Sequence, residues 1–453
     1  MAPDSRFAAP PALSDVGIRA DHNLAINFRR EVASLLNRPS NLSFPGAQPV
    51  SFARKHLDEL HNRDYYVCEK SDGIRCLLYC TNDGPKEIHY LIDRKNDYYF
   101  VDGLHFPLPP ALDAKGNPRP DHDWNEYHSN TLLDGELLVD TEPDGRQVLK
   151  YLVFDCLVMD GQDIMQRSLD KRLAYFIEKL YKPLQLLKKA FPSDTAAFKF
   201  KVEQKSFQFA YGTEMLFRDV LPALKHGNDG LIFTCRETPY KFGTDEHILK
   251  WKPARENTID FKLELTFPAW PEDDGDLAMD PNGWRFDYEA MPQFDLWVHA
   301  GDDKDERFAS MYVTPNEWEQ MKCAAMEAND GLDGAIVECY KDEEQRWRYH
   351  RFRLDKRDAN HVSTVHKVLE SIEDGVKQEE LVAIAPEVRT LWKQREARTR
   401  EQERRTREEA EKRARERAAA ATNSQRRPTG NEPAGGPATS RPPVQQDDDD
   451  GYE

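Results

Sequence analysis

The sequence lacks a long hydrophobic run, a secretory leader and any paired cysteine motif. Its 453 residues contain no apolar stretch near the roughly 18 residues that a transmembrane helix needs, so no membrane association is predicted. Residues 1–12 are rich in proline and alanine and have no apolar core, which argues against a signal peptide. The seven cysteines are scattered without a C-x-x-C pair, a pattern typical of reduced thiols in the cytosol or nucleus and unlike a structural zinc site.

A surplus of positive charge is also absent. The formal net charge of the chain is −18, whereas proteins that coat nucleic acid without sequence preference depend on neutralising its phosphates. The composition therefore argues against such a coating protein. It is compatible with an enzyme that handles one end of an RNA in a locally basic cleft.

Composition and apolar patterning divide the chain into four parts. Residues 1–40 are weakly patterned and predict little regular structure. Residues 41–254 predict a domain of antiparallel strands and helices. Residues 255–384 contain about five strand-like runs, acidic loops and an internal helix, which suits a small OB-fold barrel followed by a C-terminal helix. Residues 385–453 predict a charged, solvated helix and a disordered tail. The predicted fold class is α+β.

Residues 69–75, with the sequence EKSDGIR, lie between two short apolar runs, residues 65–68 and 76–80. Both runs are typical of β-strands. Lys70 is thereby placed at the end of a rigid strand, beside a carboxylate, a glycine and an arginine. Alone this motif carries little weight, because a strand-end lysine is most often solvated and K-x-D-G is frequent by chance.

Three further motifs strengthen the case that Lys70 is a catalytic residue. The sequence DGE at residues 134–136 interrupts an apolar strand, and Asp229 and Gly230 open another. Lys250 and Lys252 share one face of a third strand, because strand side chains alternate between faces. Each motif alone indicates a turn or an exposed face. Together they provide carboxylates and several cations on the sheet that carries a lysine.

This combination suits covalent phosphoryl transfer. A lysine attacks phosphorus only as a neutral amine, and nearby cations and desolvation favour that form. Lys250 and Lys252 suit this task and also the binding of an α-phosphate. Glu136 and Asp229 offer the oxygen ligands that Mg²⁺ or Mn²⁺ prefers, and such an ion neutralises charge during an in-line displacement. We therefore expect Lys70 to attack a nucleotide and carry it covalently.

The order of the motifs extends this interpretation: KSDGIR, LLDGELL, YLVFDCLVMDG, NDGLIF, ILKWKP and RFRLDK. In this order they resemble the covalent nucleotidyltransferases, and more narrowly the messenger RNA capping guanylyltransferases in the stand-alone form that fungi use as an alpha subunit. The hairpin YLIDRKNDYYFV and the segment WRYHRFRLDK favour capping enzymes over polynucleotide ligases. The resemblance covers residues 40–370. The ordered set is specific, whereas no single motif is.

The resemblance implies a role for each matching residue. Lys70 corresponds to the lysine that forms the phosphoamide bond with GMP. Arg75 and Arg94 correspond to ribose contacts, and Glu136 to a glutamate near the ribose and the metal. Phe154 corresponds to the aromatic ring that stacks on guanine, although such a phenylalanine is by itself more often part of a core.

The remaining matches concern the guanine edge and the phosphates. Lys205 corresponds to a lysine that reads the guanine edge, in the most loosely matching motif. Asp229 corresponds to a metal-linked aspartate, and Lys250 and Lys252 to the lysines that bind the α-phosphate. The last motif contributes the residues that orient the β- and γ-phosphates for departure of pyrophosphate: Arg351, Arg353, Asp355 and Lys356. By spacing alone, the two arginines would form a solvated strand face.

The implied activity is mRNA guanylyl transfer. GMP would pass from GTP, with Mg²⁺ or Mn²⁺, through a lysyl-N-GMP intermediate to the 5′-diphosphate end of RNA, and the barrel would act as a lid. The chain has no His-Cys-x5-Arg loop and no Gly-rich methyltransferase fingerprint, so we expect a separate RNA 5′-triphosphatase as beta subunit. The resemblance also implies docking to the phosphorylated C-terminal domain of RNA polymerase II and a nuclear location.

Two alternatives stay open at this point. An ATP-dependent polynucleotide ligase shares the lysine chemistry and differs in the nucleotide that it accepts. A non-catalytic nucleic-acid-binding scaffold built on the same two domains would form no covalent adduct with any nucleotide.

Overall fold

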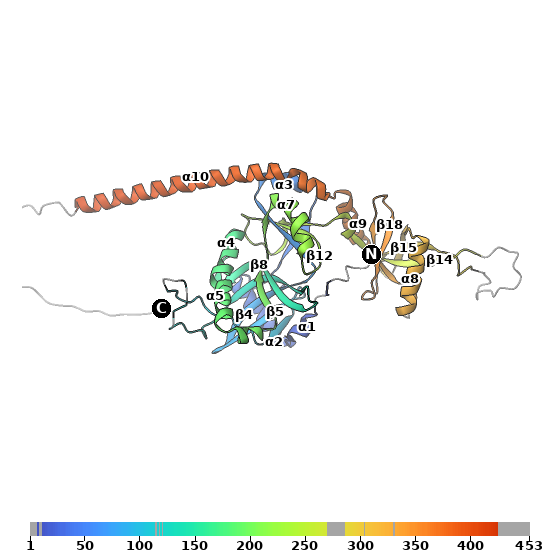
Figure 1. Cartoon of the computed structure of the whole chain (residues 1–453), viewed down its shortest axis with the longest axis horizontal. Coiled ribbons are helices and arrows are strands. Elements are labelled where there is room, and N and C mark those ends of the chain that lie inside the picture. The colour runs from blue at the N-terminus through green and yellow to red at the C-terminus, as the bar shows by residue number, and fades with distance from the viewer. Residues whose placement is uncertain are drawn as a thin grey trace, which may run out of the picture. The chain divides into compact units, whose positions relative to one another are not determined.

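The computed structural model of the chain describes residues 7–8, 11–113, 116, 118–119, 121–269, 286–302, 304–328 and 331–424. The chain divides into two compact units, Met1–Trp392 and Lys393–Glu453. Three β-sheets lie in the first unit (Figure 1). Two of these sheets build the domain that contains most of the predicted site residues, and the third builds a small C-terminal domain.

The first sheet has eight strands in the order β1-β6-β5-β4-β7-β8-β10, with β9 paired to β8. All neighbours are antiparallel except β10, which runs parallel to β8. Side chains alternate between its faces, so Leu77 and Tyr79 join one core while Cys76 and Leu78 join the other. The strands are β1 (Ile18–Arg19), β4 (Ile74–Asp83), β5 (Lys86–Ile92), β6 (Tyr98–Val101), β7 (Thr131–Thr141), β8 (Gln147–Met159), β9 (Gln162–Asp163) and β10 (Lys201–Gln204).

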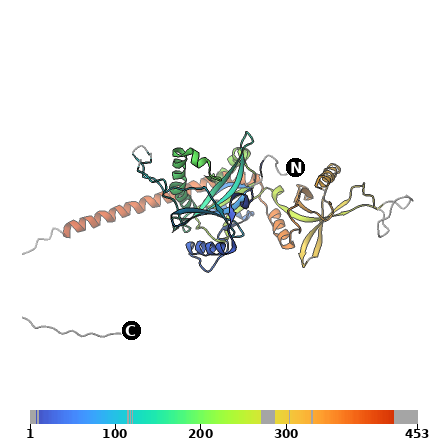
Figure 2. The same ribbon diagram turned by 90° about the horizontal axis from the view of Figure 1, so that it is seen from below.

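Helices cover both faces of this sheet. One face packs against α2 (His22–Leu35). The other packs against the continuous helical segment of α4 (Leu169–Tyr175), the π-helical turn η1 (Phe176–Tyr181) and α5 (Lys182–Ala190). Figure 2 shows the blue α2 and the green α4–α5 segment on opposite sides of the sheet. The sheet is therefore buried on both faces.

The N-terminal helices correct one prediction. Residues 1–40 were expected to be weakly structured, but α1 (Leu13–Val16), β1 and α2 lie there. Ala25, Val32 and Leu36 are buried against the first sheet. Their spacing forms a narrow apolar stripe between charged residues, and a stripe diluted in this way gives a weak periodic signal.

The second sheet has five strands in the order β11-β3-β12-β13-β2. Its core includes residues from α3 (Lys55–Asn62) and from the start of the last helix. Only β2 pairs in parallel, with β13. The strands are β2 (Ala47–Ser51), β3 (Tyr65–Ser71), β11 (Gln208–Phe209), β12 (Asn228–Cys235) and β13 (Gly243–Trp251).

Residues 72 and 73 carry the chain from the second sheet directly into the first, since β3 ends at Ser71 and β4 begins at Ile74. The two strands predicted around Lys70 are thereby confirmed. At Gly73 an added Cβ would lie 2.7 Å from the Glu136 side chain and from the carbonyl oxygen of Leu137. This crossing between the sheets therefore has room only for glycine.

The third sheet, in the C-terminal domain, has the order β16-β15-β14-β17-β18. An isolated parallel bridge between Met311 and Trp347 links the residue after β16 to β18 and so joins the two ends of the sheet. This five-stranded sheet, with a bridge between its two ends, is compatible with the small OB-type barrel predicted from the sequence. Its elements are β14 (Thr258–Thr266), β15 (Gln293–Gly301), β16 (Lys304–Ser310), α8 (Pro315–Ala328), β17 (Ile336–Lys341), β18 (Trp347–Phe352) and α9 (Val362–Glu373).

The last helix, α10, spans Gln378–Ser424 (Figure 1). Leu381, Val388 and Trp392 are buried, the first two in the core of the second sheet. The sequence therefore places the start of the charged tail, residues 385–453, too early, because the first residues of this segment supply apolar side chains to the folded body. Beyond Trp392 the helix carries i,i+4 Arg/Glu pairs, as predicted. The predicted disordered segment is residues 424–453; Ser424 is the last residue of α10, and the rest of the segment lies outside the described residues.

Short helical turns complete the described chain, and among the described helices none is both long and apolar enough to cross a membrane. The turns are α6 (Pro192–Ala196), η2 (Ala210–Gly212), α7 (Thr213–Met215), η3 (Leu216–Val220), η4 (Leu221–Ala223) and η5 (Ala254–Glu256).

Candidate active site

The carboxylate of Asp229 joins two lysines. Its Oδ1 lies 2.6 Å from Nζ of Lys70 and its Oδ2 lies 2.8 Å from Nζ of Lys252. The contact follows from strand order, because β12 lies between β3 and β13. Burial favours a higher pKa for Asp229, but Lys70 and Lys252 outweigh burial and hold the pKa of this carboxyl below its usual value. All three side chains are about a quarter exposed, so the ammonium of Lys70 is oriented and accessible.

Two further cations lie near this group without a carboxylate partner. Within the described part of the chain, neither Arg94 nor Lys250 makes a side-chain hydrogen bond or ion pair. Burial lowers the pKa of Lys250, and the charges of Lys252, Lys70 and Arg94 lower it further. Burial and the charge of Arg75 lower the pKa of Arg94. Cations that destabilise one another in this way are suited to receive an anion.

The side chain of Arg75 is almost fully buried, and each of its three nitrogens has a hydrogen-bond acceptor. Nε and Nη2 lie 3.1 and 2.7 Å from the two oxygens of Asp134, and Nη1 donates to the carbonyl oxygen of Ala47. Tyr240 donates to the same carboxylate at 2.6 Å. Burial opposes the charge of Arg75, but Asp134 outweighs it and raises the pKa of the guanidinium. Its carbon Cζ lies 5.5 Å from the ring centre of Phe154, so these two predicted residues are neighbours.

Lys205, Glu69, Ser71 and Glu136 form a second group, in which Glu69 and Ser71 come from β3, the strand that carries Lys70. Nζ of Lys205 lies 2.6 Å from Oγ of Ser71 and 3.0 Å from Oε1 of Glu69. Ser71 in turn donates to Glu136 on β7. Lys205 is 3% exposed. Lys205 therefore contacts both of the residues that flank Lys70 in the sequence, Glu69 and Ser71.

The predicted lid residues form a separate cluster at the end of β18. Arg353 lies 3.1 Å from Asp260 and 2.8 Å from Asp355, and Lys356 also pairs with Asp260. Arg351 lies 2.6 Å from a glutamate on β17. Within the described ranges, no hydrogen bond or ion pair joins these side chains to the first two sheets. The structure thus groups them with one another and not with Lys70.

Several residues of the site were not identified from the sequence. Asp134 belongs to the DGE motif, but only Glu136 was assigned; the signal available was a carboxylate inside an otherwise apolar strand. Tyr240 and Glu69 had no such signal. Their contacts join residues far apart in the chain, which spacing does not reveal.

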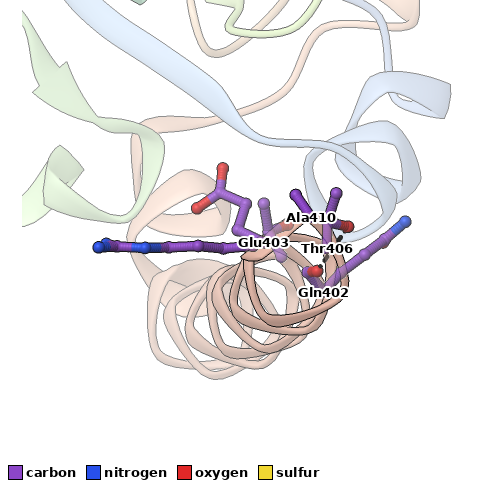
Figure 3. A pocket seen from close by; sticks show the side chains of 6 residues that line it. Gln402, Glu403, Thr406 and Ala410 are labelled. Atoms are coloured by element: carbon purple, nitrogen blue, oxygen red, sulfur yellow. Dashed lines mark hydrogen bonds between the residues drawn. The ribbon is translucent and has the colours of Figure 1, made fainter. Parts of the chain in front are cut away.

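A hollow along α10 has no relation to these residues. It is lined by side chains of a single helix, among them Gln402, Glu403, Thr406 and Ala410 (Figure 3). One helix cannot enclose a ligand, so we assign no site there.

Comparison with known proteins gives matches over most of the chain. Residues 14–254 match the family model for the mRNA capping enzyme catalytic domain, and residues 256–382 match the model for the mRNA capping enzyme C-terminal domain. The "mRNA-capping enzyme subunit alpha" of Neurospora crassa is 46% identical over 407 residues, covering 86% of this chain and 97% of that protein.

Two further relatives carry the same name. The Schizosaccharomyces pombe protein is 47% identical over 379 residues, covering 83% of this chain and 88% of the relative. The Saccharomyces cerevisiae protein is 36% identical over 428 residues, covering 88% and 90%. Among solved structures, "mycobacterial DNA ligase D complexed with ATP and MES" has 14% identity and a TM-score of 0.33, covering 69% of this chain and 95% of that chain. That likeness is too weak to bear on function.

Proposed function

Because this chain belongs to the mRNA capping enzyme family and is a guanylyltransferase, we propose that Lys70 is the nucleophile with which it takes GMP from GTP. The observation that carries this proposal is the shared carboxylate of Asp229, which orients the exposed ammonium of Lys70 beside Lys252. Lys250 and Arg94, which have no carboxylate partner among the described residues, add positive charge at the same place.

In the first step, Nζ of Lys70 forms a bond to the α-phosphorus of GTP. The bond between that phosphorus and the oxygen bridging to the β-phosphate breaks, and pyrophosphate leaves. The ammonium first gives one proton to solvent, and the nitrogen gives up a second proton to solvent as the P–N bond forms. A remaining N–H can keep its hydrogen bond to Asp229, which directs the lone pair away from the carboxylate. Lys250, Lys252 and Arg94 stabilise the charge that grows on the phosphate oxygens.

We assign the guanine base and the ribose of GTP to three other residues. Phe154 stacks on guanine. Lys205 uses two of its three N–H groups on Ser71 and Glu69, so one donor is left for the guanine edge. Arg75 faces the ribose while Asp134 holds it in place. Each role follows the family resemblance.

Glu136 and Asp229 are the residues that would hold Mg²⁺ or Mn²⁺. Among the described residues no cluster of three or more His, Cys, Asp or Glu side chains could hold a metal ion. Carboxylate oxygens are the ligands that Mg²⁺ prefers, and this ion commonly takes its other ligands from phosphates and water. When bound, the ion neutralises charge on the transferred phosphate.

In the second step, an oxygen of the 5′-diphosphate end of RNA attacks the phosphorus held by Lys70. The P–N bond breaks and a 5′-5′ triphosphate-linked guanosine is formed. The barrel acts as a lid that closes for the first step and opens for the second. Its residues Arg351, Arg353, Asp355 and Lys356 orient the β- and γ-phosphates.

The partners are also part of the proposal. The relatives are named as alpha subunits, so we expect this chain to assemble with another subunit, and more specifically with an RNA 5′-triphosphatase. Docking to the phosphorylated C-terminal domain of RNA polymerase II and a nuclear location follow the family resemblance.

The test is incubation of the chain with GTP or ATP labelled at the α-phosphate. We expect acid-stable label from GTP only, released by pyrophosphate, and none on Lys70→Ala. Label retained from ATP and not from GTP would indicate ligase chemistry. An unchanged adduct on Lys70→Ala would refute the assignment of the nucleophile.

A further inference from the structure

A network of polar and charged groups, most of them buried, lies beside Lys70 and joins the two sheets of the catalytic domain. The second sheet contributes residues on β3, and the first contributes residues on β7. The network comprises Glu69, Ser71, Glu136, Asp140, Lys205 and His226. The function proposed above uses Glu136 and Lys205 of this set and leaves His226 without a role.

The imidazole of His226 lies between two carboxylates from different sheets. Nδ1 lies 2.7 Å from Oδ1 of Asp140 on β7, and Nε2 lies 3.6 Å from Oε1 of Glu69 on β3. Nε2 is buried and has no hydrogen-bond partner among the described residues. In a neutral ring that donates from Nδ1, the lone pair of Nε2 would face the Glu69 carboxylate. That repulsion is absent when the ring is an imidazolium, so the geometry suits the charged form.

The other charged groups around His226 do not reverse this preference for the imidazolium form. Lys205 is the nearby cation that opposes protonation, and Glu69 holds its ammonium. Lys225 pairs with Glu142 at 2.6 Å, and the second oxygen of Asp140 lies 2.8 Å from Lys150. Burial lowers the pKa of His226, but Asp140 and Glu69 outweigh burial and raise it above 6.5.

We propose that His226 is a positioning residue for guanylyl transfer, whose imidazolium ties the strand of the nucleophile to the sheet that carries Arg75 and Glu136. Lys70 stands between Glu69 and Ser71, so any shift of β3 against the first sheet moves its amine relative to a nucleotide held by Arg75 and Glu136. A misplacement of about 1 Å can slow a reaction by about 100-fold. The proposal rests on the role of Lys70 proposed above.

The expected pH dependence of adduct formation follows from the direction in which the pKa of His226 is shifted. A group whose pKa is raised on folding stabilises the protein while it is protonated, and this contribution is lost as the pH rises through the raised pKa. For His226 the loss begins above 6.5. Formation of the enzyme–GMP adduct should first rise with pH, because attack needs a neutral amine, and then fall as His226 loses its proton.

The experiment measures single-turnover adduct formation from labelled GTP across pH with the full chain and with His226→Gln. Glutamine can still donate to Asp140 but carries no charge. We expect a rate about 10- to 100-fold lower in His226→Gln, with little change in the KM for GTP and without the descending alkaline limb. The matched control is His128→Gln. His128 is also buried and contacts Asp160 and the carbonyl oxygen of Lys179, at 2.8 and 2.9 Å. His128→Gln should lower the stability of the protein and leave the rate of adduct formation and its pH profile unchanged.

A second variant covers the case in which His226→Gln does not fold. Asp140→Asn removes one of the two carboxylates, so the alkaline limb should move to lower pH, together with the imidazole titration of His226 followed by NMR. A wild-type rate and profile in His226→Gln, or an alkaline limb unmoved in Asp140→Asn, overturns the proposal. Absence of any adduct in the wild type would instead refute the role of Lys70.

Discussion

Replacing Asp134 with asparagine tests how the first sheet holds Arg75. Asp134 is 0% exposed, the Arg75 side chain is 9% exposed, and their shorter bond is 2.7 Å. Asparagine keeps the shape of aspartate but carries no charge, so the guanidinium stays buried without its counter-ion. Breaking one partner of a buried ion pair costs about 3–5 kcal/mol. Because whole domains are stable by only about 5–15 kcal/mol, we expect Asp134→Asn to lose a large part of the stability of its domain.

The assay is urea unfolding of Asp134→Asn, Arg75→Met and the double variant. If the pair is coupled as the geometry indicates, the double variant should lose less stability than the sum of the two single losses. Asp155→Asn provides a matched control, because Asp155, on β8 of the same sheet, is similarly buried and pairs with Arg172 of helix α4 at 2.7 Å. It should lose comparable stability, whereas GMP adduct formation should fall more in Asp134→Asn. Additive losses would refute the coupling.

Further predictions concern the close contacts of the site. Gly230→Ala would place a Cβ 2.0 Å from the carbonyl oxygen of Trp251, so we expect little soluble folded protein on expression. Trp251→Phe removes the indole N–H that donates to Val376 at 2.7 Å; we expect a loss of about 1–3 kcal/mol in urea unfolding and faster proteolysis near residues 374–377. Lys250→Met removes a cation without a carboxylate partner among the described residues, so the KM for GTP should rise about tenfold or more without loss of thermal stability. Chelation with EDTA should abolish adduct formation, and Mg²⁺ or Mn²⁺ should restore it.

Each of these predictions has a contrary result. Wild-type stability of Gly230→Ala would show that the backbone at Trp251 yields to a methyl group. Unchanged proteolysis of Trp251→Phe would mean that the indole bond does not secure the start of α10. A large stability loss in Lys250→Met would indicate a structural role for this lysine. Full activity in EDTA would refute a metal requirement.

The element boundaries near the site were predictable because they depend on local patterns. The apolar runs around residues 69–75 alternate as strands do, and β3 and β4 lie there. The helix α2 was missed because its buried residues are few and separated by charges. The first turns of α10 were assigned to a solvated tail because their apolar side chains are covered only by a distant part of the chain, the core of the second sheet.

The sequence by itself determined which kinds of side chain this protein brings to its chemistry: a strand-end lysine, acids next to glycines, and paired lysines on a strand. The tertiary structure alone decided which of them meet. Asp229 contacts Lys70 across 159 positions of sequence because β12 pairs with β3, and Asp134 reaches Arg75 because β7 pairs with β4. Strand order is set by the burial of whole apolar faces, a long-range property that no local spacing records. For the same reason His226, which belongs to none of the sequence motifs, could be identified only from its position between two carboxylates.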